Sequence, residues 1–137
     1  MSRIDGLEIV RACERIIFKS HPKFWALENP ATGDLADYLG KPKLTFQPYE
    51  YGDGWAKKTA IWGNFNEPTK THTWSNCPKL DLYIRPGRGK PSLAFQHKSA
   101  MKNIPQFTPF ADHIKSDYDL RSITPPGFAK VFFDANQ

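Results

Sequence analysis

The chain has 137 residues, the size of one small domain or of part of a larger one. Hydrophobic residues make up 39% and aromatic residues 14%, which predicts a packed core and excludes a globally disordered chain. Twelve prolines predict many loops and few long helices, and two cysteines favour a reducing compartment over a disulfide framework. The polar N-terminus predicts no signal peptide, and no stretch has the length of a membrane span, so we expect a cytoplasmic protein without a membrane partner.

The net charge of +5 is concentrated in one segment, residues 70–102, which alone carries +6. A basic block of this kind suits a polyanion such as DNA. The alternative is a solvated loop region that keeps the protein soluble. The charged residues are Lys70, Lys79, Arg85, Arg88, Lys90, Lys98 and Lys102, with the single acid Asp81.

The first predicted element is an amphipathic helix over residues 6–19, with Asp5 as its N-cap. His21-Pro22 ends it, since a residue before proline disfavours the helical conformation. The apolar stripe of this helix comprises Leu7, Val10, Cys13, Ile16 and Ile17.

A short apolar run, Phe24-Trp25-Ala26-Leu27, follows and predicts a central strand covered on both faces. It ends in Glu28-Asn29-Pro30, which would place a carboxylate and an amide at the carboxyl end of the strand. Open α/β sheets place their chemistry at that end. Glu28 is therefore a candidate acid that Asn29 could orient. The alternative is a structural glutamate that caps a helix or pairs with a lysine.

Further elements are predicted along the rest of the chain. A short helix over 35–39 should end at Gly40, strands are expected over 43–46 and 59–62, and a helix over 125–135 should begin at Thr124-Pro125. Residues 66–109 lack periodicity, apart from a possible strand over 80–84. Trp55, Trp62 and Trp74 favour core or rim positions, although the neighbouring lysines would also suit a flipped base or a single strand.

The sequence shows no zinc spacing and no phosphate-binding glycine loop, so no metal site is predicted. Cys13 lies on the apolar stripe of the helix predicted over 6–19, which favours a packed core thiol over a nucleophile.

Two segments together resemble the DNA (cytosine-5) methyltransferases, in particular those of phages and prophages. The run ending in Glu28-Asn29-Pro30 is similar to that family's strand ending in Glu-Asn-Val or Glu-Asn-Pro. Tyr51-Gly52-Asp53-Gly54-Trp55-Ala56-Lys57-Lys58-Thr59 resembles its Tyr-Gly-x-Pro-Gln-x-Arg-x-Arg segment. The resemblance implies that Glu28 contacts N3 and the exocyclic amine of a flipped cytosine. It implies that Asn29 belongs to the same catalytic motif and that Lys57 stands for the first arginine.

The C-terminal run 122–129 resembles more loosely the Asn-x-Val-Pro-Pro helix start, which lines the S-adenosylmethionine pocket. This implies cofactor-binding positions at Thr124, Pro125 and Pro126. The fold implied is a partial Rossmann-like domain over 1–65 and 110–137, with 66–109 as a reduced target-recognition region. The DNA-contacting residues expected are Lys58, Arg85, Arg88, Lys90 and Lys98.

The chain contains neither the family's Phe-x-Gly-x-Gly cofactor loop nor its Pro-Cys nucleophile. A cytosine-5 mechanism requires a thiolate. We therefore expect the C-terminal part or a subunit of such an enzyme, inactive alone, with an N-terminal subunit as partner. S-adenosylmethionine would serve the complete enzyme and would not bind tightly to this chain alone. The alternatives are a non-catalytic DNA-binding protein of that fold, or a remnant that forms a homodimer through an exposed sheet edge.

Overall fold

The computed structural model describes residues 3–137 and has mixed α/β structure, as predicted. Its helices and strands are α1 (Arg3–Ser20), β1 (Trp25–Pro30), α2 (Leu35–Leu39), β2 (Leu44–Phe46), β3 (Thr59–Asn64), α3 (Asp117–Ser122) and α4 (Pro126–Ala135). Single-turn and longer 3-10 segments are η1 (Pro48–Tyr51), η2 (Leu93–Phe95), η3 (Lys98–Asn103) and η4 (Pro105–His113).

The helix predicted over 6–19 is confirmed as α1, but it begins at Arg3. Asp5 therefore lies in the first turn instead of at the N-cap, where its charge still favours the helix dipole. His21, with a φ of 48°, takes the left-handed conformation that ends the helix before Pro22. Ile16 was expected on the apolar stripe but is 65% exposed, because it lies on the opposite side of the helix from Leu7.

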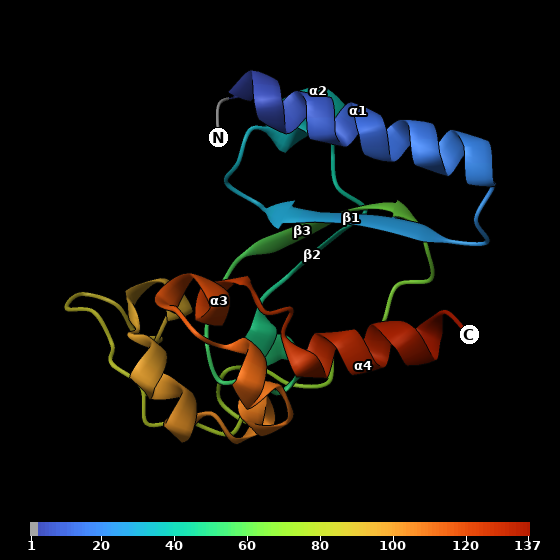
Figure 1. Ribbon diagram of the computed structural model, residues 1–137. Coiled ribbons are helices and arrows are strands. Elements are labelled where there is room, and N and C mark those ends of the chain that lie inside the picture. The colour runs from blue at the N-terminus through green and yellow to red at the C-terminus, as the bar shows by residue number, and fades with distance from the viewer. Residues whose placement is uncertain (1–2) are drawn as a thin grey trace.

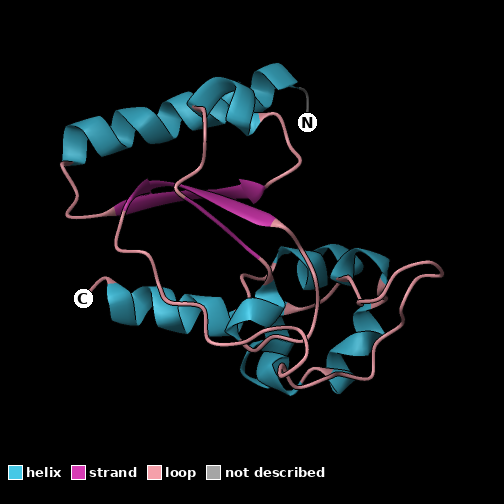
Figure 2. Ribbon diagram, turned by 180° about the vertical axis from the view of Figure 1, so that it is seen from behind, coloured by secondary structure: helices cyan, strands magenta, loops and turns pink. Residues whose placement is uncertain are grey.

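The three strands form an antiparallel sheet in the order β1-β3-β2. In the register, Glu28 of β1 and Leu44 of β2 both lie opposite Ile61 of β3. Helices α1 and α2 lie on one side of this sheet and α4 lies on the other (Figure 1). The view from behind shows the same three layers, with the short helices between β3 and α4 gathered beside the N-terminal end of α4 (Figure 2).

The prediction that β1 is a central strand, covered on both faces, is wrong. Its residues alternate between half-buried and exposed, and its outer edge pairs with no strand in residues 3–137. The central strand is β3, in which Thr59, Ala60, Ile61 and Trp62 are all buried. A short apolar run is compatible with either position, because strand order is set by pairing partners elsewhere in the chain.

The strand proposed over 80–84 is also wrong, since these residues form no strand. The side chain of Gln96 replaces a neighbouring strand there. Its amide nitrogen donates to the Tyr83 carbonyl at 2.7 Å, and its oxygen accepts from the Tyr83 amide at 3.2 Å. The backbone polar groups of Tyr83 are thus satisfied without a ladder.

Two apolar cores hold the molecule together. One lies between the sheet and α4, where the rings of Phe46 and Phe128 stack at 4.0 Å. In the other core, Trp55 and Leu120 pack against four residues from the segment that begins at η2 and ends before α3. These four are Leu93, Ile104, Phe107 and Ile114. Within residues 3–137, no helix is long and apolar enough to cross a membrane.

Candidate functional site

A small cavity on the α4 side of the sheet brings together segments that are far apart in the sequence. Glu28 reaches it from β1, Lys57 from the loop before β3, and Thr124 and Pro125 from the start of α4. Its volume is about 30 Å³, which is room for one water molecule. Its remaining walls are Phe46, Thr59, Ser122, Ile123 and Phe128.

Glu28 is exposed, whereas a strand covered on both faces, as predicted, would have buried it. Its side chain points to the α4 face of β1, because successive strand residues point to opposite faces. Within residues 3–137, its carboxylate has no hydrogen bond and no ion pair. The structure therefore gives no support to a helix cap or a lysine pair at this position.

Lys57 is half-buried and held at both its ends. Its backbone amide donates to Gln47 Oε1 at 2.8 Å, and its Nζ donates to the carbonyl of Arg121 at 3.3 Å. That carbonyl belongs to the last turn of α3, where a cation is favoured by unpaired carbonyls. The ammonium group has no carboxylate partner within residues 3–137.

The start of α4 lies one residue later than predicted. Pro125 is the N-cap and Pro126 occupies the first turn, whereas Thr124 is an exposed residue before the helix. Proline suits the first turn because its missing amide would have no partner there. Thr124 and Pro125 line the cavity and Pro126 does not.

Asp53 was not identified as a functional residue from the sequence. It is 3% exposed, and its carboxylate accepts hydrogen bonds from the Gly127 amide at 2.8 Å and from Gln106 Nε2 at 3.0 Å. Burial raises the pKa of Asp53, and these two donors oppose the rise. The residue thus fastens the Tyr51–Thr59 segment to α4 and to η4, both of which lie far away along the chain.

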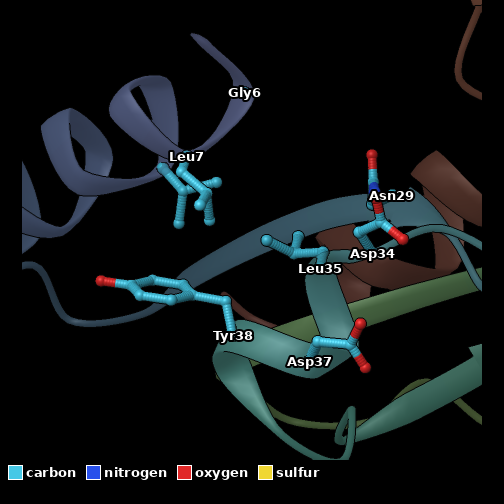
Figure 3. A pocket seen from close by; sticks show the side chains of 8 residues that line it. Gly6, Leu7, Asn29, Asp34, Leu35, Asp37 and Tyr38 are labelled. Carbon is cyan, nitrogen blue, oxygen red and sulfur yellow. The ribbon is translucent and has the colours of Figure 1, made fainter. Parts of the chain in front are cut away.

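Asn29 lies on the opposite face of the sheet from Glu28. It lines a larger cavity, of about 340 Å³, between β1, α1 and α2. Figure 3 shows Leu7 of α1 facing Leu35 and Tyr38 of α2 across this cavity. Asn29 therefore does not orient Glu28, because the strand period of two separates the two side chains.

Three of the five predicted DNA-contacting residues lie around one cavity. Arg85, Arg88 and Lys90 line a hollow of about 360 Å³ together with Ala56, Gly89, Ser92 and Phe95. Lys58 and Lys98 are exposed and do not line it. The Nζ of Lys98 donates instead to the Lys115 carbonyl at 3.3 Å.

Neither cysteine lies at any of these cavities. Cys77 is 3% exposed, and burial raises the pKa of its thiol, which disfavours the reactive thiolate. Cys13 is half-buried on α1. No cluster of His, Cys, Asp and Glu that could hold a metal ion occurs within the part of the chain that the structure describes.

Comparison with known proteins identifies a distant relative. The chain is 29% identical over 93 residues to a protein of Frog virus 3 (isolate Goorha) described as a probable DNA (cytosine-5)-methyltransferase. The match covers 65% of this chain and 44% of that protein, so the chain spans less than half of the relative's length. No protein-family model and no solved structure match the chain. The sequence is therefore similar, at a distance, to that of a protein described as a DNA (cytosine-5)-methyltransferase.

Proposed function

We propose that this chain supplies the cytosine-binding part of a DNA (cytosine-5) methyltransferase. The observation that carries the proposal is the convergence of Glu28, Lys57 and Thr124 on one cavity, although 96 positions separate the first from the last. The resemblance concerns these same segments, and the viral relative has the matching description.

In this proposal the carboxyl group of Glu28 recognises the target base. A carboxyl group accepts a hydrogen bond from the exocyclic amine and shares a proton with ring atom N3. Lys57 would hold the adjacent phosphate or the base oxygen. Because the cavity has a volume of only about 30 Å³, the rim formed by Ser122–Pro125 must move to admit a pyrimidine.

The chain is proposed to be inactive alone, because the described thiols lie away from the cavity and Cys77 is buried. The residues at Thr124, Pro125 and Pro126 do not by themselves form a pocket of the size that S-adenosylmethionine requires. They would form at most one wall of it. We propose that a segment outside these 137 residues, in the same polypeptide or in a second subunit, supplies the nucleophile and the rest of the cofactor site.

The outer edge of β1, which pairs with no strand within residues 3–137, supports the proposal that the sheet is incomplete. We propose that the three strands are part of a larger Rossmann-like sheet, in which a strand of that outside segment would pair with β1. A second copy of this chain is the alternative occupant of that edge.

The test is methyl transfer from labelled S-adenosylmethionine to duplex DNA. The chain would be mixed with a polypeptide that carries the N-terminal part of a related methyltransferase, including its Pro-Cys loop. We expect activity only in the mixture. Glu28→Gln should abolish that activity and leave DNA affinity within about twofold. The variant should still fold, because an exposed carboxylate without a partner contributes little to stability.

Glu67→Gln is the matched control, because Glu67 is exposed and does not line the cavity. Equal activity of the Glu28→Gln and Glu67→Gln mixtures would exclude the role proposed for Glu28. A mixture that binds DNA but shows no methylation would instead favour a non-catalytic DNA-binding protein, for which the basic cavity provides the specific support.

A further inference from the structure

The basic cavity described above has the dimensions of a ligand site. Its volume of about 360 Å³ lies within the range of pockets that take one small molecule or one nucleotide. Its lining comes from the loop at 85–90, from η2 and its N-cap Ser92, and from Ala56. An unpaired base can enter a hollow of this kind, whereas a duplex can only place its phosphates against the exposed side chains of Arg85 and Arg88.

The charge of the cavity selects an anion. Arg85, Arg88 and Lys90 line it, and no carboxylate does. None of the three forms an ion pair within residues 3–137. Arginine forks are suited to binding phosphate in a bidentate manner.

One aromatic ring, that of Phe95, lines the cavity next to its cations, and two further rings lie near Lys90 without lining the cavity. Phe95 is 48% exposed, and the guanidinium of Arg85 lies 4.6 Å from the centre of its ring. Lys90 Nζ lies 5.4 Å from the ring centre of Tyr49 and 5.7 Å from that of Trp74. Alternating cations and aromatic rings bind unpaired nucleotides, because each base presents a face on which a ring can stack.

The basic cavity and the Glu28 cavity are separated by a single segment of backbone. Ala56 lines the basic cavity and the next residue, Lys57, lines the Glu28 cavity. The Ala56 amide donates to the Pro91 carbonyl at 2.9 Å, which ties this segment to the rim of the basic cavity. Adjacent residues of the chain therefore line the two cavities.

We propose that the basic cavity binds an unpaired nucleotide of a DNA strand, with its phosphate on Arg85, Arg88 and Lys90 and its base on Phe95. This inference rests on the proposed function in taking DNA as the ligand. It adds a site for a nucleotide other than the target cytosine.

The test measures the affinity of the whole chain for three labelled probes by fluorescence anisotropy. The probes are a thymidine single strand, the same strand made abasic, and a duplex of equal length. Phe95→Leu should weaken binding of the thymidine strand about tenfold through loss of stacking. It should leave the abasic strand and the duplex within about twofold.

Arg85→Gln with Arg88→Gln should weaken binding of all three probes, because every probe carries phosphate. The matched control is Arg11→Gln with Arg15→Gln, which removes the same charge from exposed positions on α1. Circular dichroism of each variant checks that the fold is kept.

An unchanged affinity of Phe95→Leu for the thymidine strand would overturn the inference, as would an equal loss for the duplex. Equal effects of the two arginine pairs would also overturn it. Displacement of the thymidine strand by micromolar thymidine monophosphate would reassign the cavity to a free nucleotide. Failure of the methylation assay affects the proposed function alone, because these binding measurements require no partner polypeptide.

Discussion

At the scale of single residues, Glu28 and Asn29 show how a strand divides neighbouring side chains. They are adjacent in sequence and line different cavities on opposite faces of the sheet. Asp53 shows the reverse, since its carboxylate joins Gly127, 74 positions away, through a hydrogen bond of 2.8 Å. The Glu28-Asn29 motif therefore does not act as one unit in the fold, whereas Asp53 links two segments that are distant in sequence.

The raised pKa of Asp53 predicts a specific pH dependence of stability. The folded state holds the Asp53 proton more tightly than the unfolded state does, so the stabilisation is full below the ordinary pKa of 3.8 and is lost as pH rises through the raised value. Asp53→Asn does not titrate, and its amide oxygen still accepts from the Gly127 amide.

We therefore expect the free energy of unfolding of Asp53→Asn, minus that of the wild type, to increase from about pH 3 to about pH 7. Urea unfolding at a series of pH values measures this difference. A difference that stays constant or falls with pH would contradict the role of burial at Asp53.

At the scale of elements, the start of α4 is packed against the loop that carries the site. A Cβ atom built on Gly127 lies 2.1 Å from the Tyr51 carbonyl oxygen and 3.1 Å from Asp53 Oδ2. This close approach requires glycine at the position. It keeps Pro125 at the wall of the Glu28 cavity, beside Phe128.

Gly127→Ala should accordingly destabilise the protein by about 2 kcal/mol, because the backbone must move apart. Gly6→Ala is the matched comparison, since no atom lies within 4 Å of its added Cβ. Gly6 lies inside α1, where alanine should stabilise the helix by roughly 0.5–1 kcal/mol. Thermal unfolding of both variants measures the change in stability. A change of the same sign for both variants would contradict the packing argument.

At the scale of the whole molecule, the net positive charge lies in a different part of the chain from the three-stranded sheet. The +6 of residues 70–102 lies in the irregular region beside the N-terminal end of α4, whereas the rest of the chain is nearly neutral. Trp55 and Leu120 share a core with that region, so the basic surface is held at a fixed position relative to the Glu28 cavity. This arrangement suits a polyanion that spans both.

Duplex DNA binding should therefore depend steeply on salt. Replacing Arg85, Arg88 and Lys90 together by Gln should reduce the slope of log affinity against log salt by about 2 to 3, or about 0.9 for each phosphate that the variant no longer neutralises. The control replaces Arg11, Arg15 and Lys19 on α1. Equal slopes for the two triple variants would place the DNA elsewhere on the surface.

The sequence by itself determined most of the α-helices and strands and the family resemblance, but it indicated neither α3 nor the 3-10 segments. Periodicity located α1, β2, β3 and α4 to within a few residues, because the spacing of apolar residues reflects the helix and strand repeats directly. It also located the basic region, since charge is a property of composition. The roles assigned to Glu28 and Lys57 remain predictions.

Only the tertiary structure decided which strand is central, which side chains share a cavity and where the irregular region packs. The apolar run of β1 was compatible with burial, but β3 took the central position because it pairs with both other strands. The grouping of Glu28, Lys57 and Thr124, and of Arg85 with Phe95, depends on the approach of distant segments to one another. That approach is set by the packing of the whole chain, and local sequence patterns do not encode it.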